Sequence, residues 1–241
     1  MLWDKEPLNL QPAEGNQKPS VLLHASALSE VSVVADALTF AGFDVIRVTE
    51  PEKLLFKVQN EKPDMVAVCP GNSVVTSELL ECIEAACNTE KLPILFQSDE
   101  DVAWDGNHVV CDTVSTGTNF AGLYMLSRGL MRRVRPWSLD QVIRFGALEL
   151  WESRFQIHLD GRSVALGRSD FNILGSLFDA PDHAFDRETL LRLAFGRYAA
   201  KKEDRIVDVR ICATRNLLKE ALNCDLIETV RGVGYKLARI E

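Results

Sequence analysis

A predicted helix over residues 205–222 has two chemically different faces. At about 100° per residue, one face collects the side chains expected to pack on a domain core: Val207, Ile211, Thr214, Leu218 and Ala221. The opposite face collects polar and small apolar side chains: Arg205, Ile206, Val209, Ala213 and Asn216, with Arg210 on one flank. A solvated face would not expose isoleucine and valine, whereas a face that meets base edges and thymine methyl groups in a major groove would.

The polar side chains of this helix suit different parts of a DNA duplex. Asn216 has the paired donor and acceptor that match adenine, and Arg205 or Arg210 can bind guanine or a phosphate. Arg215 and Lys219 lie nearer the rim of the face, where phosphate contacts are made.

A glycine-containing hairpin follows the helix. Two predicted strands, Leu226–Val230 and Gly234–Ala238, flank the tip sequence RGVG. The glycines let the tip approach a backbone closely, so Arg231 is expected to enter a minor groove, with Thr229 and Lys236 on phosphates. The alternative is that helix and hairpin only complete a core.

Shorter strands and helices precede this helix in the chain, and the predicted strands alternate apolar and polar residues. Alternating patterns predict strands at Ile143–Leu150, Phe155–Leu159 and Val164–Leu166, and helical patterns follow at Ser169–Phe178 and Arg187–Ala194. Asp186 stands before the second helix as a good N-cap. These elements predict an α+β domain over 139–240.

Three sequence strings in this region resemble one known family. They are RIVDVRICATRNLL at 205–218, FDRETLL at 185–191 and TVRGVGYKL at 229–237. They resemble the winged helix-turn-helix DNA-binding domain of OmpR/PhoB-type response regulators, which implies a four-stranded sheet, three helices and a hairpin wing. The resemblance implies groove contacts at Arg205, Ile206, Val209, Arg210, Ala213 and Arg215, and wing contacts at Thr229 and Arg231.

The resemblance implies one further contact, and the chain departs from the family pattern at three positions. The loop 195–204 matches the segment that touches RNA polymerase in several family members. Position 206 is usually Thr in the family, 210 is often His and 213 is often a long basic residue, whereas this chain has Ile206, Arg210 and Ala213. The operator sequence of a better-known relative therefore does not transfer.

The first half of the chain, residues 19–135, alternates short apolar runs with amphipathic stretches. Strands are predicted at Val21–His24, Val45–Val48, Met65–Cys69 and Ile94–Gln97, with helices at Leu28–Ala41, Pro51–Asn60, Thr76–Ala86 and Asn119–Val134. This alternation predicts a doubly wound α/β parallel sheet with helices on both faces. The arginines at 132, 133 and 135 are expected at a solvated helix end.

This half resembles a receiver domain more weakly, through strings such as KPDMVAV and KLPILF. A receiver holds Mg²⁺ with an acidic pair, forms an acyl phosphate on an aspartate, and contacts the phosphoryl group with a hydroxyl and a lysine. Aligned on the strands, these positions hold Ala25 and Ser26, Cys69, Ser98 and Thr116. Only Ser98 keeps its chemistry, so neither the metal cage nor the acyl phosphate is expected.

Other functions of this degenerate pocket stay open. Cys69 is expected to be an inert thiol rather than a redox sensor, because no Lys or Arg lies within a few residues to lower its pKa. His24 is expected to be structural rather than a pH switch. The segment 98–119 is short for the family, so a homodimer would use an altered activation face or be permanent.

Bulk properties frame these predictions. The formal net charge of the chain is −8, but residues 187–241 hold 12 basic against 8 acidic side chains, so positive charge collects where DNA would bind. Residues 1–18 are expected to be a disordered tail, and 136–138 a linker. The six cysteines have no metal-ligand spacing, no cofactor is indicated, and the N-terminus lacks a secretory signal, which favours the cytoplasm.

The sequence therefore predicts a two-domain transcription regulator that binds double-stranded DNA as a homodimer without phosphorylation. Two alternatives remain: a regulator whose receiver-like pocket senses a ligand or thiol oxidation, and a conventional phospho-switched response regulator. An enzyme is not expected, because no glycine-rich cofactor loop, nucleophile elbow or paired carboxylates are found.

Overall fold

The computed structural model describes residues 9–12, 18–25, 31–69, 77–87, 91–99, 108–139, 141–203 and 205–238. The chain divides into two compact units. Residues Gln17–Ser138 form the first, here called the α/β unit, and Met1–Asn16 with Leu139–Glu241 form the second, the winged-helix unit. Among the described residues, no helix combines the length and apolar character that crossing a bilayer requires.

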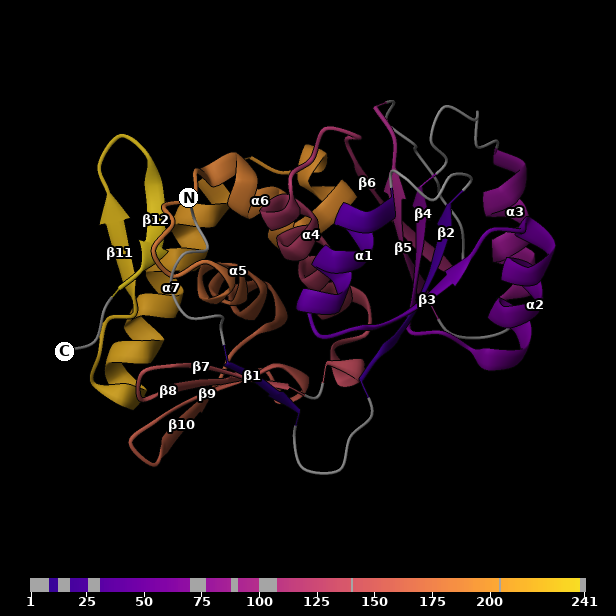
Figure 1. Cartoon of the computed structure of the whole chain (residues 1–241). Coiled ribbons are helices and arrows are strands. Elements are labelled where there is room, and N and C mark those ends of the chain that lie inside the picture. Colours follow the sequence, from indigo (N-terminus) through magenta and orange to yellow (C-terminus); the bar gives the residue numbers. More distant parts are fainter. Residues whose placement is uncertain are drawn as a thin grey trace. The chain divides into compact units, whose positions relative to one another are not determined.

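The α/β unit is built on a five-stranded parallel sheet with the order β3-β2-β4-β5-β6. Its strands are β2 (Ser20–Ala25), β3 (Asp44–Val48), β4 (Met65–Cys69), β5 (Leu92–Gln97) and β6 (Val109–Val114). Its helices are α1 (Val31–Phe40), α2 (Pro51–Glu61), α3 (Ser77–Ala86) and α4 (Phe120–Val134). Helices α1 and α4 cover one face, and α2 and α3 the other (Figure 1). The predicted doubly wound fold is confirmed, in the flavodoxin-like order.

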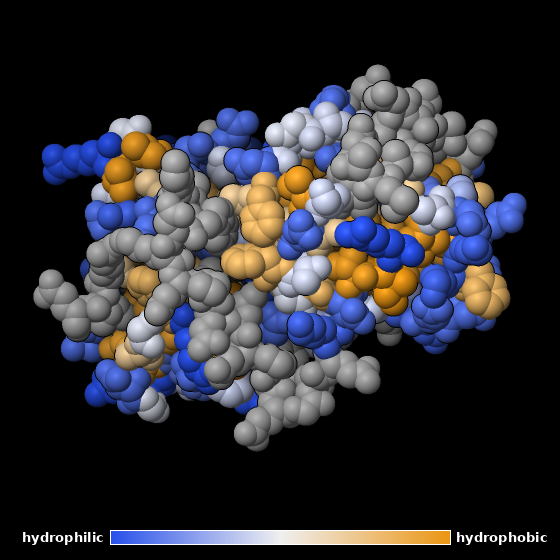
Figure 2. Space-filling model, viewed as in Figure 1, coloured by the Kyte–Doolittle hydropathy of each residue, from blue (hydrophilic) through white to orange (hydrophobic). Residues whose placement is uncertain are grey.

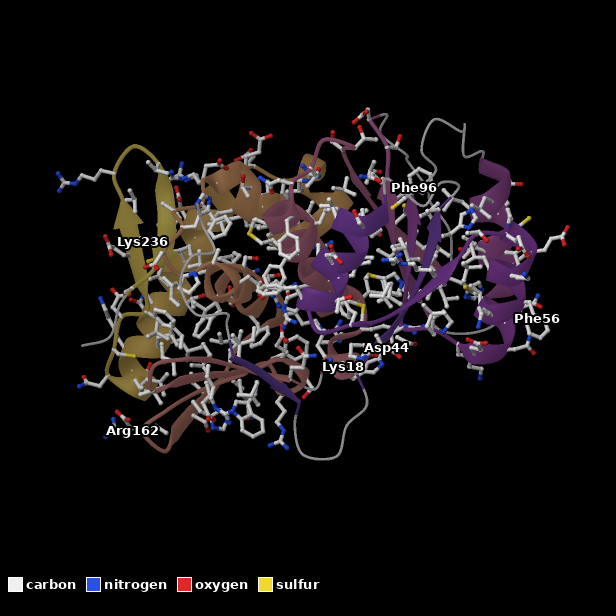
Figure 3. All side chains as sticks on the ribbon, viewed as in Figure 1. Lys18, Asp44, Phe56, Phe96, Arg162 and Lys236 are labelled. Atoms are coloured by element: carbon white, nitrogen blue, oxygen red, sulfur yellow. The ribbon has the colours of Figure 1, made fainter. Side chains whose placement is uncertain are left out.

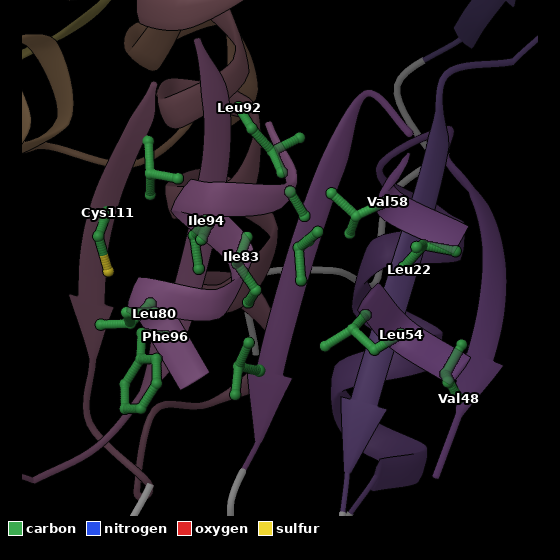
Figure 4. Packing of buried hydrophobic residues seen from close by; sticks show 14 residues of the cluster. Leu22, Val48, Leu54, Val58, Leu80, Ile83, Leu92, Ile94, Phe96 and Cys111 are labelled. Atoms are coloured by element: carbon green, nitrogen blue, oxygen red, sulfur yellow. The ribbon is translucent and has the colours of Figure 1, made fainter. Parts of the chain in front are cut away.

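Burial on both faces of the sheet explains why its strands are nearly continuous apolar runs. All five residues of β4 are buried. On the α2–α3 face, Leu22, Ile94 and Phe96 belong to one packed cluster with Leu54 and Ile83 (Figure 4). No bounds were predicted for β6, although the alignment of Thr116 presupposes a strand directly before it.

The end of α4 is tied to the sheet rather than solvated. Arg135 donates to the carbonyl oxygens of Pro63 (2.9 Å) and Lys91 (2.9 Å), and Arg133 pairs with the buried Asp112. The expected linker is a short 3-10 helix, η1 (Pro136–Ser138), whose Ser138 hydroxyl donates to Asp64 at 2.6 Å. The bonds of Arg135 and Ser138 fix the end of α4 and η1 to the residues directly before β4 and β5.

The winged-helix unit begins with a five-stranded antiparallel sheet, β1-β7-β8-β9-β10. After β1 (Asn9–Pro12) come β7 (Gln141–Phe145), β8 (Leu148–Trp151), β9 (Gln156–Leu159) and β10 (Arg162–Ala165). The helices are α5 (Arg168–Asp179), α6 (Arg187–Phe195) and α7 (Arg205–Leu222), with a 3-10 helix η3 (Gly196–Lys201), and the wing is β11 (Ile227–Val230) and β12 (Gly234–Leu237). Helix α6 starts at the predicted N-cap, where Asp186 accepts from the amide of Thr189.

Two predictions for this unit are corrected. The single strand expected at 143–150 is a hairpin, because Gly146 has φ +60° and turns the chain between β7 and β8. The expected disordered tail contains β1, which pairs antiparallel with β7, with Leu10 opposite Ile143 (Figure 1). A strand at a sheet edge is held by backbone hydrogen bonds, so the polar composition of the tail does not prevent it.

Removing residues 1–16 is expected to expose the backbone of β7. The loss of the β1–β7 hydrogen bonds should cost about 1 kcal/mol of local stability, or about a fivefold loss of amide protection. Hydrogen exchange measured by mass spectrometry on a peptide covering 141–145 tests this, with the peptide of β4 as the internal control. Equal protection of 141–145 in the full and shortened chains would contradict the pairing.

Candidate nucleic-acid interface

Helix α7 separates a buried face from an exposed one, as its periodicity predicts. The buried side chains are Val207, Ile211, Thr214, Leu218 and Leu222. Ala221, expected in this set, is half-buried, and Leu222 takes its place at the last turn. The core contact of α7 is therefore shifted by one residue at its C-terminal end.

The exposed face of α7 carries the predicted mixture of polar and apolar side chains. Arg205, Ala213 and Asn216 are exposed, and Val209 is exposed over 59% of its surface. Ile206 and Arg210 are half-buried on one flank. A surface with this composition can donate hydrogen bonds to base edges and also contact thymine methyl groups.

Arg215 holds the wing against α7. Its Nε and Nη2 atoms donate to the carbonyl oxygen of Ile227 at 3.1 and 2.7 Å, and Nη2 also donates to the Thr229 hydroxyl at 2.8 Å. The sequence assigned both Arg215 and Thr229 to DNA contacts. The structure gives them an intramolecular contact, in which most of the guanidinium edge is used.

Tyr235 of β12 joins the wing to two helices. Its hydroxyl donates to Asp208 of α7 at 2.6 Å, and Arg187 of α6 donates to the same carboxylate at 2.7 Å. Burial alone would raise the pKa of Asp208, but the hydrogen bonds from Tyr235 and Arg187 outweigh it and hold the pKa below its usual range. The Tyr235 ring lies 5.3 Å from the guanidinium carbon of Arg187 and 5.7 Å from that of Arg215.

The backbone strengthens this junction. Tyr235 and Phe185 exchange two hydrogen bonds of 2.8 and 2.9 Å. A Cβ at Gly234 would lie 2.0 Å from the carbonyl oxygen of Phe185, so only glycine fits there. Sequence reasoning missed this junction, although its residues come from the three strings that carry the family resemblance, FDRETLL, RIVDVRICATRNLL and TVRGVGYKL.

Several of the predicted DNA-contacting cations already have acidic neighbours. Arg210 lies 3.7 Å from Asp170, Lys219 lies 3.2 Å from Asp225, and Lys236 lies 3.1 Å from Glu228. By contrast, Arg205 and Arg231 are exposed and make no ion pair within the described residues. These two arginines can meet a phosphate or base without breaking an internal pair.

The tip of the wing combines charge with apolar surface. Arg231 is exposed, Gly232 has φ +76°, and Val233 is exposed over 46% of its surface. Hydrophilic and hydrophobic side chains lie next to one another at the wing tip, at the upper left of the space-filling view (Figure 2). Lys236 lies lower on the wing (Figure 3). The tip can therefore reach a groove while the base stays packed on the domain.

The carboxyl ends of β2, β4 and β5 bring together most of the residues assigned to a receiver pocket. Ala25 and Cys69 are both buried and lie directly opposite each other in the β2–β4 ladder. Ser98 follows β5 and Thr116 follows β6, whereas Ser26 lies outside the described residues. The carboxylate of Asp99, in the loop after β5, lies at this edge and is hydrogen-bonded to Ser115 and Thr116.

Two side chains of this edge have intramolecular partners. The Nδ1 atom of His24 donates to the carbonyl oxygen of Val48 at 3.0 Å, as a structural histidine does. Asp99 accepts from the hydroxyls of Ser115 (2.7 Å) and Thr116 (2.5 Å) and from the Thr116 amide (3.0 Å). These bonds, the one from the Thr116 hydroxyl first, hold the pKa of Asp99 below its usual range.

Comparison with known proteins finds transcription regulators. Residues 161–237 match the family model described as "Transcriptional regulatory protein, C terminal". The phosphate regulon transcriptional regulatory protein PhoB of Rhizobium meliloti (strain 1021) is 29% identical over 207 residues, which cover 81% of this chain and 88% of that protein. TorR of Escherichia coli O157:H7, the TorCAD operon transcriptional regulatory protein, is 33% identical over 109 residues, 45% of this chain and 46% of that protein.

One similar solved structure is the Klebsiella pneumoniae RstA DNA-binding domain in complex with RstA box. It is 34% identical and covers 40% of this chain and 96% of that one, with a TM-score of 0.35.

Substituting Tyr235→Phe is expected to loosen the wing while keeping the contacts of the ring with Arg187 and Arg215. Loss of the hydrogen bond to a half-exposed carboxylate should cost about 1 kcal/mol at neutral pH. Because Asp208 has a lowered pKa, this stability is present above the pKa of an unfolded aspartate and is lost as the pH falls through the folded value. Thermal unfolding at neutral and acidic pH measures both effects, and a difference that grows in acid would refute the assignment.

Proposed function

Because this chain is a response regulator of the OmpR/PhoB type, we propose that it controls transcription by binding specific sequences of double-stranded DNA. The observation that carries this proposal is the composition of α7, whose exposed face offers Arg205, Val209, Ala213 and Asn216 while the opposite face is in the core. Arginine and asparagine discriminate base pairs by hydrogen bonds, and valine and alanine contact thymine methyl groups.

The wing supports the same proposal. Its tip carries an exposed arginine without an internal ion pair in the described part of the chain, and its base is fixed to α7 through Arg215 and Tyr235. With α7 in a major groove, Arg231 would reach the neighbouring minor groove, where the negative potential attracts arginine. Asn216 then matches adenine, and Lys219 and Lys236 contact phosphates after exchange with their acidic neighbours.

We propose that DNA binding does not depend on phosphorylation. Two of the groups that an acyl phosphate needs are replaced by Ala25 and Cys69, both buried at the carboxyl ends of their strands. Thr116, at the position of the phosphate-binding lysine, is hydrogen-bonded to Asp99. Because Cys69 stands at the end of β4 in place of a nucleophilic aspartate, no acyl phosphate forms at that position.

The remaining parts of the proposal concern assembly. One winged helix buries about 600–1,000 Å² on DNA, which gives limited selectivity, so we propose a homodimer on repeated half-sites. The segment 195–204, which contains η3 and the half-exposed Tyr198, is proposed to contact RNA polymerase. With DNA and RNA polymerase as its partners, the protein is proposed to act in the cytoplasm.

In vitro selection from a random duplex library with the full chain is expected to enrich one motif. Replacing Arg231→Ala should weaken binding to the selected duplex and lower the slope of log K against log salt by about 0.9, since one phosphate-region contact is lost. The matched control is Arg162→Ala, an exposed arginine of the same unit on the hairpin of β9 and β10 (Figure 3). Failure to enrich any motif at low ionic strength would overturn the proposal.

Incubation with acetyl phosphate and Mg²⁺ is expected to leave the intact mass and the DNA affinity unchanged. The expectation follows from the missing carboxylates, because neither the metal nor the phosphoryl group has its ligands. A gain of one phosphoryl group that hydroxylamine removes would reveal an acyl phosphate and support a conventional switch. An affinity that instead changes on mild oxidation, and no longer does so in Cys69→Ser, would support thiol sensing.

A further inference from the structure

Asp170 and Arg210 form an ion pair unlike the other pairs of the interface. Asp170 is the third residue of α5, its side chain is 17% exposed, and its Oδ1 atom lies 3.7 Å from Nη1 of Arg210 on α7. The acidic partners of Lys219 and Lys236 are 36% and 51% exposed. Of these three carboxylates, that of Asp170 is therefore the most buried.

The surroundings confine this carboxylate. A Cβ placed on Gly167 would lie 3.3 Å from Oδ2 of Asp170, so the start of α5 encloses one side of the carboxyl group. Burial raises the pKa of Asp170, and the charge of Arg210 opposes that shift. A buried carboxylate keeps its charge at lower cost when a cation stays close, so each partner restrains the other.

The pair leaves part of Arg210 available. A guanidinium has five N–H donors in a planar fork, and the distance of 3.7 Å is beyond hydrogen-bond length, so the contact with Asp170 is electrostatic. The Arg210 side chain is 43% exposed. It lies one turn after Ile206 and less than one turn before Ala213, on the flank of the exposed face of α7.

The charge of Asp170 favours one type of DNA contact over another. A carboxylate beside α7 repels a phosphate that approaches Arg210. A guanine, by contrast, presents only neutral acceptor atoms in the major groove. A tethered guanidinium also loses less side-chain freedom when it binds. Both effects favour contact with a base edge.

We propose that Asp170 is a positioning residue that holds Arg210 for reading one base pair of the operator. The proposal rests on the DNA-binding function proposed above and deepens it. Arg210 contacts the base pair, and Asp170 improves the discrimination at that base pair by holding Arg210 without touching a base itself. Asp170 thereby connects α5, which packs on α7, to the sequence specificity of the protein.

The test uses the full chain and the duplex motif selected with it. Arg210→Ala first identifies the base pair whose preference collapses. Asp170→Asn, which keeps the shape and removes the charge, is expected to lower discrimination at the same base pair at least fivefold. Its affinity for an unrelated duplex should be unchanged or higher, because a negative charge near the DNA is lost.

The matched control is Glu228→Gln, which removes the same charge from the Lys236 pair on the wing. It is expected to raise affinity for selected and unrelated duplexes alike without changing discrimination at any base pair. In the double variant Asp170→Asn/Arg210→Ala, discrimination should equal that of Arg210→Ala alone, because Asp170 acts through Arg210.

Unchanged discrimination in Asp170→Asn, or additive effects in the double variant, would overturn the positioning role while leaving the DNA-binding function intact. If Asp170→Asn unfolds by circular dichroism, Asp170→Ser takes its place, since serine also removes the charge and is tolerated in the first turn of a helix. It is expected to lower discrimination at the same base pair, and retention of that preference would equally overturn the proposal. A wild-type chain that selects no motif would instead refute the function itself.

Discussion

The DNA-binding surface depends on the insertion of one aromatic ring between the wing and the helices. Tyr235 donates a hydrogen bond to Asp208 of α7 through its hydroxyl and pairs with Phe185 through its backbone, and its ring lies 5.3 Å from the guanidinium carbon of Arg187 and 5.7 Å from that of Arg215. The grooves of a duplex have fixed widths, about 12 Å for the major and about 6 Å for the minor groove. A helix and a hairpin can use both grooves only if their mutual angle is fixed before binding, and Tyr235 fixes it.

The pairing of charges explains how an acidic chain can present a DNA-binding face. The formal net charge is −8, but a DNA phosphate interacts mainly with the charged side chains closest to it. Arg187 and Arg215 are used inside the domain, and Lys219 and Lys236 are balanced by neighbours. Arg205 and Arg231 are the exposed arginines that we propose attract the duplex. A face with few uncompensated cations binds random DNA weakly, so base contacts account for a larger share of its affinity.

The sequence predicted those features that depend on neighbours along the chain. The two faces of α7 follow from its helical period, and the buried strands such as Met65–Cys69 follow from continuous apolar runs. What it missed depends on partners far away in the sequence: β1 against β7, Arg135 on Pro63, and Tyr235 on Asp208. Arg215 was assigned to DNA for the same reason, because nothing local reveals that the carbonyl of Ile227 lies within its reach.

In the α/β unit, the residues that stabilise the fold differ from the residues that phosphoryl chemistry would use. Its sheet is stabilised by apolar side chains in the middle of the strands, such as Val66 opposite Ile94, whereas phosphoryl chemistry would take place at the carboxyl edge. At that edge Ala25 and Cys69 are small and buried, and Asp99 joins the loop after β5 to the loop after β6. A phosphoryl switch works by adding charge that creates new hydrogen bonds between loops. Here a carboxylate of the protein already makes such bonds, so we expect one arrangement of these loops, and any influence of this unit on DNA binding to arise from its surface.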